Sequence, residues 1–596
     1  MSTPDTLTKL FFDAVDRFSS KRAALRHKKD GSWRDITHQE LARTVHHAAV
    51  GLWELGLRPG DRVAILSGNR PEWAVADYAC LTARCADVAV YPTIPAAQVA
   101  YVLSDSAATA AFVADRAQYH KILEARAEAP ALKHLISFDP SIEGPDVLSL
   151  QRLCQSGAAA EGRYPGYRRD ACAVARDDLA TLIYTSGTTG HPKGVMLSHY
   201  NIASNVGAAL KVLNIGPEDS CLSFLPLSHS FERMAGHYTM FHAGATICYA
   251  ESVDQVPANL LEVRPTIVLT APRLFEKVYA RVLEKAVRGG ALRRAGFFWA
   301  RGTAERWADM SLARRPIPSG LVWKKRLADK LVFSKLHKLT GGRIRFFVSG
   351  GAPLAPEIAR FFYAAGLPVL EGYGITETSP VVSVNPLEAP RIGTVGPILP
   401  GLEARITSDG EILVRGPNVM KGYYGKPKAT REVIDREGWF HTGDLGEFDS
   451  ENYLKITDRK KDVFVTAGGR SIAPQPIENK VKANKYVQNA VLIGDKRKFP
   501  SILVVPNADA LELWATEQGI LAEPGKFFEH PEVVAKIERE VKLCLSSLAS
   551  YEMPEKVLIV ENDFTVESGE LTPSSKVRRN VVEQHYRDRI EELYRE

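Results

Sequence analysis

The chain of 596 residues has no apolar run approaching the roughly 20 residues needed to span a bilayer, which argues against a membrane-spanning helix. It does not open with a basic segment followed by a long apolar core, so we expect no secretory signal. Cysteine is scarce. The seven cysteines form no Cys-x-x-Cys pair, and an odd number cannot pair completely within one chain. A reduced, cytoplasmic compartment is therefore the simplest expectation.

Internal repeats and long low-complexity tracts are also absent from the sequence. Hydrophobic residues make up 45% of the chain and charged residues 24%, which is typical of globular proteins and excludes a disordered chain or a fibre. Because the chain is too long for one compact domain, we expect it to divide near exposed linkers.

The net charge of +6 is unevenly distributed. Between Arg281 and Arg345 the chain has 17 Lys or Arg residues against 4 Asp or Glu residues, a local charge of +13, so the remainder carries about −7. Aromatic side chains are interleaved with this charge. Region 281–345 therefore suits anionic lipid headgroups or a polyphosphate ligand. The alternative is a helical region with a solvated basic face and its aromatic side chains in the core. No nucleic-acid module accompanies the charge, which disfavours nucleic acid as a partner.

Strand-like runs, such as LATLIYT at 179–185, alternate with helix-like runs along most of the chain. This alternation predicts an α/β fold with a substantial parallel sheet. From about Gly393 short strands with Gly and Pro turns, as in GTVGPILPG, predict a β-rich subdomain at about 391–458. A smaller α+β unit begins after Asp458, where the charged run 458–462 is typical of a hinge.

A run of glycines and hydroxyl residues directly follows the strand predicted at 179–185. In this run, TSGTTGHPKG, glycines let backbone N–H groups turn around an anion, and the hydroxyls and Lys193 add further donors. It is not a Walker A loop, because Gly194 stands where that pattern needs Ser or Thr. The alternative is a flexible surface loop.

This run resembles the phosphate-loop signature of the adenylate-forming enzymes, which include acyl-CoA synthetases, peptide-synthetase adenylation domains and beetle luciferases. The resemblance extends through nearly the whole chain and is greatest to bacterial long-chain fatty acyl-CoA synthetases. It implies nucleotide contacts by Thr185, Ser186, Gly187, Thr188, Thr189, Gly190 and Lys193.

A second segment, EGYGITET at 371–378, resembles the family's adenine and metal motif. An aromatic ring such as Tyr373 can stack on a purine, and Glu377 offers a hard oxygen to Mg²⁺. The resemblance implies that Thr185 and Glu377 hold this metal. The alternative is a buried glutamate that caps backbone donors in a turn. Further implied nucleotide contacts are Gly351, Ala352, Glu371, Gly372, Gly374 and Thr376.

The segment HTGD, which ends at Asp444, resembles the family motif whose carboxylate binds both ribose hydroxyls. The run that starts at Asp458 implies a ribose contact by Arg459 and a hinge at Lys461. The resemblance thus implies a large N-terminal domain, residues 1–458, of layered α/β subdomains with the β-rich subdomain. A small mobile α+β lid domain, residues 459–596, follows it.

Two segments of the small domain and one of the large domain carry the remaining implied roles. Lys576, in GELTPSSKVRR, matches the family's catalytic lysine, whose ammonium would stabilise charge developing in the transition state. The run GGRSIAP, with Gly468, Gly469 and Arg470, resembles the loop that faces the CoA channel; the alternative is a strand turn with a bulge. LPLSHSFER, with His229 and Phe231, resembles the long-chain subgroup's acyl-pocket segment, where these side chains would gate acyl and CoA entry; the alternative is packed structure.

The resemblance thus implies a long-chain fatty acid–CoA ligase with Mg²⁺ as cofactor and with ATP and CoA as co-substrates. Such an enzyme activates a fatty acid with ATP to acyl-AMP, releasing pyrophosphate, and then forms the thioester with CoA, releasing AMP. The expected location is the cytoplasm, with a peripheral contact between region 281–345 and the inner face of the membrane. Two other interpretations stay open. A fatty acyl-AMP ligase would deliver the acyl group to an acyl carrier protein, and an inactive membrane-binding scaffold would lack nucleotide contacts.

Overall fold

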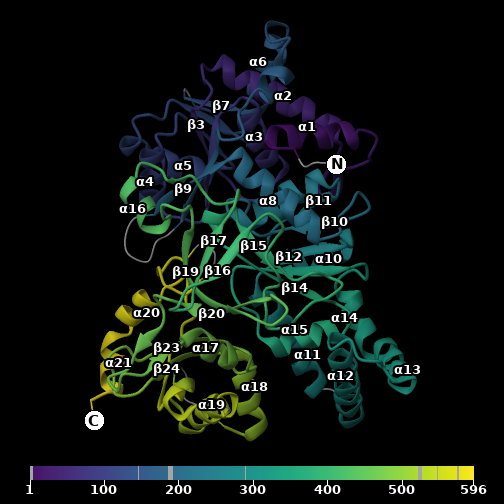
Figure 1. The fold of residues 1–596 in the computed structure, drawn as a ribbon, viewed down its shortest axis with the longest axis vertical. Coiled ribbons are helices and arrows are strands. Elements are labelled where there is room, and N and C mark those ends of the chain that lie inside the picture. Colours follow the sequence, from purple (N-terminus) through teal and green to yellow (C-terminus); the bar gives the residue numbers. More distant parts are fainter. Residues whose placement is uncertain are drawn as a thin grey trace.

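The computed structural model describes residues 4–144, 146–185, 192–288, 290–520, 526–546, 548–572 and 576–595. Within them the α/β class predicted from the sequence is confirmed. Two large sheets and a smaller antiparallel sheet form the body of the molecule, and a smaller α+β part follows residue 460 (Figure 1).

The first large sheet has eight strands in the order β18–β9–β8–β4–β3–β5–β6–β7. From β8 to β7 all neighbours are parallel, whereas β9 and β18 are antiparallel additions at one edge. The strands are β3 (Arg62–Leu66), β4 (Ala86–Val90), β5 (Ala110–Val113), β6 (His134–Ser137), β7 (Val147–Ser149), β8 (Leu179–Thr185), β9 (Lys193–Ser198) and β18 (Gly422–Tyr423). The strand predicted at 179–185 is thus β8.

The second large sheet has the order β15–β14–β13–β12–β10–β11–β1–β2, parallel except at its two edges. Its strands are β1 (Leu25–Lys29), β2 (Ser32–Ile36), β10 (Ser220–Ser223), β11 (Thr246–Tyr249), β12 (Ile267–Thr270), β13 (Phe346–Ser349), β14 (Val369–Gly374) and β15 (Val381–Val384). Most of its central strands are buried on both faces, which is why they are short, continuously apolar runs.

The two sheets share one core, because successive side chains of a strand point to opposite faces. In β3, Val63 and Ile65 belong to the core between the sheets, whereas Ala64 and Leu66 face the outer layer. The shared core also takes in helices α1 (Leu7–Arg17), α2 (His38–Glu54), α3 (Pro71–Thr82) and α8 (His199–Val212). Outer layers follow on both sides, with α4 (Ala96–Ser106) and α5 (Arg116–Ala125) on one and α10 (Val256–Val263) and α15 (Pro356–Ala364) on the other.

The β-rich region forms an antiparallel sheet of β16 (Glu403–Ile406), β17 (Glu411–Arg415), β19 (Phe440–Phe448) and β20 (Leu454–Arg459). Two details differ from expectation. The run 393–401 contains no strand. A bridge between Ser383 and Ile398 and backbone hydrogen bonds to Val382 and Leu454 hold its turns. Strand β18 leaves this region and pairs with β9 of the first sheet, beside the predicted phosphate loop.

The C-terminal part has its own hydrophobic clusters, built from residues 464 onward. A three-stranded sheet of β23 (Val487–Ile493), β24 (Ser501–Pro506) and β25 (Lys556–Ile559) packs against helices α17 (Pro474–Lys482), α18 (Ala508–Gln518), α19 (Pro531–Cys544), α20 (Arg579–His585) and α21 (Arg587–Leu593). A hairpin of β21 (Phe464–Val465) and β22 (Ser471–Ile472) precedes them. Figure 1 shows this part below the body.

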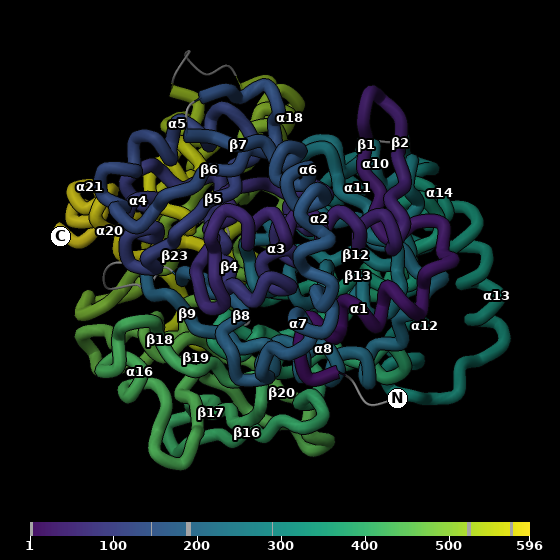
Figure 2. Tube along the Cα trace, turned by 90° about the horizontal axis from the view of Figure 1, so that it is seen from above, coloured from purple at the N-terminus to yellow at the C-terminus, as the bar shows by residue number. Residues whose placement is uncertain are grey.

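Region 281–345 is helical, as one of its two interpretations expects. It comprises the C-terminal part of α11 (Pro272–Arg288) together with α12 (Ala291–Leu312), α13 (Ser319–Ala328) and α14 (Ser334–Leu339). In Figures 1 and 2 helix α13 lies at the periphery of the molecule, far from the first sheet. Within the described residues, no helix has the length and apolar character needed to cross a membrane.

Candidate active site

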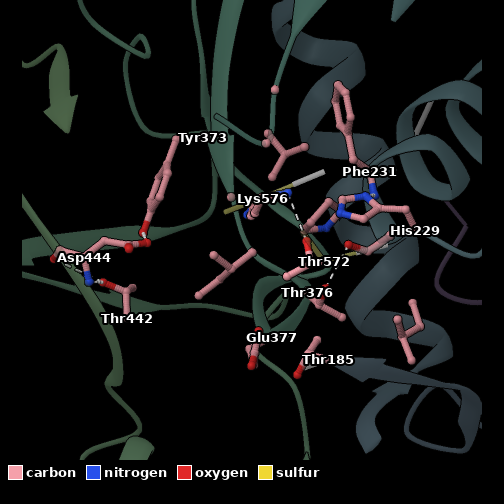
Figure 3. A pocket seen from close by; sticks show the side chains of 18 of the residues that line it. Thr185, His229, Phe231, Tyr373, Thr376, Glu377, Thr442, Asp444, Thr572 and Lys576 are labelled. Carbon is pink, nitrogen blue, oxygen red and sulfur yellow. Dashed lines mark hydrogen bonds between the residues drawn. The ribbon is translucent and has the colours of Figure 1, made fainter. Parts of the chain in front are cut away.

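A cleft of about 1050 Å³ lies between the body and the C-terminal part. It brings together residues that are up to several hundred positions apart in the sequence. Figure 3 shows Lys576 between the Tyr373–Asp444 pair and the segment of His229 and Phe231. The predicted site residues that line the cleft are Thr185, Lys193, His229, Phe231, Gly351, Gly372, Tyr373, Gly374, Thr376, Glu377, Asp444, Arg459, Lys461 and Lys576.

Other predicted residues lie elsewhere. Ser186, Gly187, Thr188, Thr189 and Gly190 are outside the described residues. Ala352 is exposed and does not line the cleft.

Glu371 is buried beneath the cleft, where its carboxyl accepts a hydrogen bond from the backbone N–H of Leu354 at 3.3 Å. Burial raises its pKa to about 7. This is the geometry of the alternative weighed for the motif, a glutamate that caps backbone donors. The structure therefore separates Glu371 from its motif partner Glu377, which does face the cleft.

Gly468, Gly469 and Arg470 form an exposed turn between β21 and β22, away from the cleft. The turn needs glycine at 469, where φ is +75°. The guanidinium of Arg470 lies over the Tyr551 ring, 5.5 Å from its centroid. In this conformation the small part presents Lys576 to the cleft and keeps the 468–470 turn outside.

One wall of the cleft carries a buried carboxylate between a phenol and a guanidinium. The Tyr373 hydroxyl donates to an Asp444 oxygen at 2.7 Å, and Arg459 Nε lies 3.1 Å from the other oxygen. Antiparallel pairing of β19 with β20 sets Asp444 opposite Arg459. Asp444 is only 4% exposed, so water cannot replace these partners. The wall therefore offers a fixed anionic acceptor next to an aromatic face.

The floor of the cleft brings Glu377 and Thr185 together (Figure 3). A Glu377 carboxylate oxygen accepts a hydrogen bond from the Tyr423 hydroxyl at 2.9 Å, and burial raises the carboxyl pKa. The Lys193 ammonium lies 4.9 Å from the centroid of the Tyr423 ring. Tyr423 of β18 thus connects Glu377 to the strand that leaves the predicted phosphate loop.

These oxygens suit a magnesium ion that is held mainly by phosphates. Within the described ranges no group of three or more His, Cys, Asp or Glu side chains could hold a metal alone. Glu377 and the Thr185 hydroxyl supply two hard oxygen donors beside a cleft large enough for a nucleotide. Mg²⁺ is commonly bound by one or two protein oxygens plus substrate phosphates, so the residues present fit it.

Lys576 enters the cleft from the C-terminal part. Its backbone is fixed by two hydrogen bonds with Thr572, one of which runs from Thr572 N–H to the Lys576 carbonyl at 2.8 Å. Burial and the nearby Arg459 cation lower the pKa of the Lys576 ammonium to about 8, and the Asp444 and Glu377 carboxylates oppose this shift. The ammonium is thus a poorly solvated cation facing the space between the two carboxylates.

The segment of His229 and Phe231 is fixed against its surroundings. The Ser230 hydroxyl lies 3.1 Å from the Thr376 hydroxyl, and His229 Nδ1 accepts the Phe231 N–H at 3.2 Å. The Phe231 ring packs so closely on Gly350 that a Cβ there would lie 3.1 Å from it. Burial and the Lys576 cation lower the pKa of His229 to about 4, so the imidazole is neutral.

Sequence reasoning assigned no role to the residues that brace this segment. Arg233 is fully buried and pairs with Asp77 and Asp87 from the first sheet's side of the core. Asn69 donates to the Ser223 hydroxyl at 3.0 Å and accepts the Leu227 N–H at 2.9 Å.

No role was predicted for Tyr423 either, although its hydroxyl contacts Glu377. No local pattern in KGYYGKP points to a carboxylate partner, and an isolated arginine or asparagine carries no signal either. These contacts join residues that are at least 46 positions apart.

An apolar branch of the cleft extends behind His229, between α8 and the π-helix Glu232–Thr239. Small and aliphatic side chains line it, including Ala209, Leu213, Met234, Ala235 and Met240. Apolar walls of this kind exclude water and favour a hydrocarbon chain. The cleft therefore joins a polar part to an apolar part.

Two family models match the chain. One, described as AMP-binding enzyme, matches residues 11–424, and one described as AMP-binding enzyme C-terminal domain matches residues 461–596. The chain therefore belongs to the AMP-binding, adenylate-forming enzymes.

Among curated relatives, the long-chain-fatty-acid–CoA ligase FadD15 of Mycobacterium tuberculosis is 37% identical over 95% of this chain and 93% of its own. The peroxisomal long chain acyl-CoA synthetase 7 of Arabidopsis thaliana is 32% identical over 99% of this chain and 86% of its own.

Solved structures share the fold at lower identity. The adenylation domain of the carboxylate reductase from Mycobacterium chelonae has a TM-score of 0.76 at 23% identity, covering 99% of this chain and 91% of that one. The anthranilate CoA ligase AuaEII, solved with anthranoyl-AMP, has a TM-score of 0.75 at 17% identity, with 99% of each chain covered. At these identities the likeness concerns the arrangement of elements.

Proposed function

We propose a two-step reaction for this chain, which is a long-chain fatty acid–CoA ligase by its family membership and uses ATP and CoA as co-substrates. One observation supports the proposed residue roles: side chains that are far apart in the sequence face the same cleft. Lys576, Glu377 and Asp444 face one cleft that also opens into an apolar branch. A scaffold without nucleotide contacts does not need this arrangement.

In the first step a fatty carboxylate oxygen attacks the α-phosphorus of ATP, and the bond from that phosphorus to the pyrophosphate oxygen breaks. The acyl chain lies in the apolar branch, the ribose on Asp444 and the adenine beside Tyr373. The Lys576 ammonium stabilises the negative charge shared by the carboxylate and the α-phosphate. Mg²⁺, bound with ATP by Thr185 and Glu377, would neutralise phosphate charge.

In the second step the CoA thiol loses its proton to water and its sulfur attacks the acyl carbonyl carbon. The bond from that carbon to the AMP phosphate oxygen breaks, and AMP leaves. Lys576 occupies the cleft in the present conformation, whereas the 468–470 turn lies outside it. We propose that the C-terminal domain, residues 459–596, turns about a hinge at Lys461 and presents the 468–470 turn to incoming CoA. The neutral His229 and Phe231 form the wall that CoA passes.

Substitution of Lys576 tests the division into two steps. Lys576→Ala should slow acyl-adenylate formation by about 10²–10³-fold, by analogy with the loss of one oxyanion donor. The same variant should still convert supplied acyl-adenylate and CoA to thioester. Pyrophosphate exchange measures the first step, and thioester release measures the second. Lys496→Ala, at a side chain that is 88% exposed, is the matched control. Equal loss of both half-reactions would contradict the proposal.

We also propose a cytoplasmic enzyme with a peripheral contact between region 281–345 and the anionic inner face of a membrane. The basic charge of this region supports the contact, and seven free cysteines suit a reducing compartment. Co-sedimentation with anionic vesicles should weaken as salt rises, because salt screens exposed charges. Binding that is insensitive to salt, or no binding, would contradict the proposed contact.

A further inference from the structure

The helical region 281–345 combines exposed apolar side chains with a strongly basic charge. Several large apolar side chains are exposed, with Leu292 at 90%, Trp323 at 65% and Leu331 at 56%. The same region has a local charge of +13. The interpretation that places its aromatic side chains in the core holds for Phe297 and Phe333, which are buried, but not for Phe298, Trp299 and Trp323.

The acids of this region do not neutralise its basic charge. Glu284 pairs with Arg288, Glu305 with Arg301 and Asp329 with Lys325, while Asp309 pairs with Arg360 outside the region. Each of the four acids thus already has a cation. Most of the lysines and arginines therefore remain available to an anionic partner.

A groove of about 300 Å³ lies between α12 and α13. Phe298, Gly302 and Arg306 line it from α12, where a spacing of four residues puts them on one face. Leu321 and Lys324 line it from α13. The groove thus has apolar walls and two cations. Among the described residues, neither Arg306 nor Lys324 forms an ion pair.

Gly302 keeps this groove open. A Cβ built on Gly302 meets no atom within 4 Å, so a side chain there would extend into free space. Glycine in a helix interior is destabilising relative to alanine in general. No packing contact in the structure requires the glycine.

We infer that α12 and α13 form a bilayer-docking arm whose groove takes an anionic phospholipid, with the acyl chain against Phe298 and Leu321 and the phosphate beside Arg306 and Lys324. This inference rests on the proposed membrane contact and assigns it to one site. The exposed Trp323 of α13 and the exposed Leu331 of the π-helix that follows it, Asp329–Phe333, enter the interfacial layer of the bilayer. The peripheral position of α13 leaves the arm room to approach a flat surface (Figure 1, Figure 2).

A pair of isosteric substitutions separates charge from shape in the groove. Gly302→Glu places a carboxylate there, whereas Gly302→Gln places an amide of the same size. We expect Gly302→Glu to bind vesicles of phosphatidylcholine with phosphatidylglycerol about tenfold more weakly than Gly302→Gln, because it repels the lipid phosphate and offsets the groove cations. Arg306→Gln and Lys324→Gln should each weaken binding about fivefold. Leu543→Gln, at a side chain 62% exposed on α19, is a control that should bind as the wild type does.

The same variants distinguish this inference from the ligase function. Pyrophosphate exchange with a short, water-soluble acid should be unchanged in all of them, since the arm does not line the cleft. With a long-chain acid supplied in anionic vesicles, Gly302→Glu should be slower than Gly302→Gln. The inference is overturned if the two variants bind vesicles equally, or if phosphatidylcholine alone binds as well as the anionic mixture. If the wild-type protein catalysed no pyrophosphate exchange, the ligase function would be overturned instead. Vesicle binding is measured separately and does not depend on that activity.

Discussion

At the scale of single residues, the chemistry depends on ionisable groups that the fold removes from water. The Lys576 ammonium has a pKa lowered to about 8 by burial and by the Arg459 cation. Raising the pH through this value removes the proton and with it the positive charge that we propose for the first step. The neutral His229, with a pKa of about 4, does not titrate in the same range.

We therefore expect kcat/KM for ATP in the adenylation step to be constant below about pH 8 and to fall about tenfold per pH unit well above it, since this parameter reports groups of the free enzyme. Lys576→Arg provides the control, because a guanidinium stays charged throughout. Its activity is lower, but its profile should not fall at this pH. Measured pyrophosphate exchange that declines at the same pH in both proteins would assign the titration to another group.

Tyr423 acts on the proposed metal site through one hydrogen bond to Glu377. Tyr423→Phe keeps the ring under Lys193 but removes the donor that favours the charged carboxylate. Because hydrogen bonds to charged groups contribute about 1.5–3 kcal/mol, the Mg²⁺ concentration for half-maximal activity should rise at least tenfold. Activity at saturating Mg²⁺ should change little.

Calorimetric titration of Mg·ATP into the variant should show the same weakening without turnover. Tyr424→Phe, at the adjacent tyrosine, is the matched control and should behave as the wild type does. If Tyr423→Phe lowered activity by the same factor at every Mg²⁺ concentration, Tyr423 would not act through the metal site.

At the scale of elements, the π-helix Glu232–Thr239 shapes the apolar branch. Its packing is tight on one side, where a Cβ on Gly236 would lie 2.6 Å from the Glu232 carboxylate. That carboxyl accepts a hydrogen bond from Ser223 at 2.6 Å, and burial raises its pKa to about 8, so it is mostly protonated at neutral pH. The other side presents Met234 and Ala235 to the cleft.

Ala235→Phe should therefore shorten the range of acids that the enzyme accepts. A ring in the apolar branch blocks the far end of a long chain, and overpacking typically costs about 1–3 kcal/mol. We expect KM for the longest acids to rise roughly 10–100-fold with short acids little affected. Pyrophosphate exchange over a series of chain lengths measures this, with Ala235→Ser as the control. A uniform loss over all lengths would place the acyl chain elsewhere.

At the scale of the whole molecule, one ion pair joins helix α11 of the body to the C-terminal part. Arg273 of α11 pairs with Asp563 at 2.8 Å, and within the C-terminal part Asn489 also donates to Asp563 at 3.0 Å. Both charged side chains are about one-third exposed, at 38% and 31%, so the pair contributes at most about 1 kcal/mol. An ion pair this weak can stabilise one position of the C-terminal part and still break when that part moves.

Arg273→Gln should thus favour the second conformation. We expect adenylation to slow by about two- to fivefold, while thioester formation from supplied acyl-adenylate is unchanged or faster. Asp563→Asn should have the same effect, and the double variant should add little, since both substitutions break one contact. Measurement of both half-reactions in the three variants checks this. Fully additive losses would show that the pair does not act as a latch.

Local patterns predicted much of the fold. The run 179–185, predicted as a strand, is β8 to the residue. In the β-rich region the glycines and prolines of 393–401 form turns, and the first strand of its sheet, β16, begins at Glu403. Glu371 and Glu377 belong to one sequence motif and carry the same carboxyl group. Glu371 accepts a hydrogen bond from the backbone of Leu354, whereas Glu377 faces the cleft. Which of them faces the cleft depends on packing that a local pattern does not contain.

The amino-acid order alone was sufficient for the family, for the α/β class and for many of the elements, because these depend on short-range spacing and side-chain type. Only the folded chain decided that β18 pairs with β9, that Tyr423 reaches Glu377, and that Lys576 enters a cleft built by residues far from it in sequence. Such contacts arise when sheets and domains pack. They are long-range, so no local propensity encodes them, and their free energy comes from the burial of surfaces that meet only in the tertiary structure.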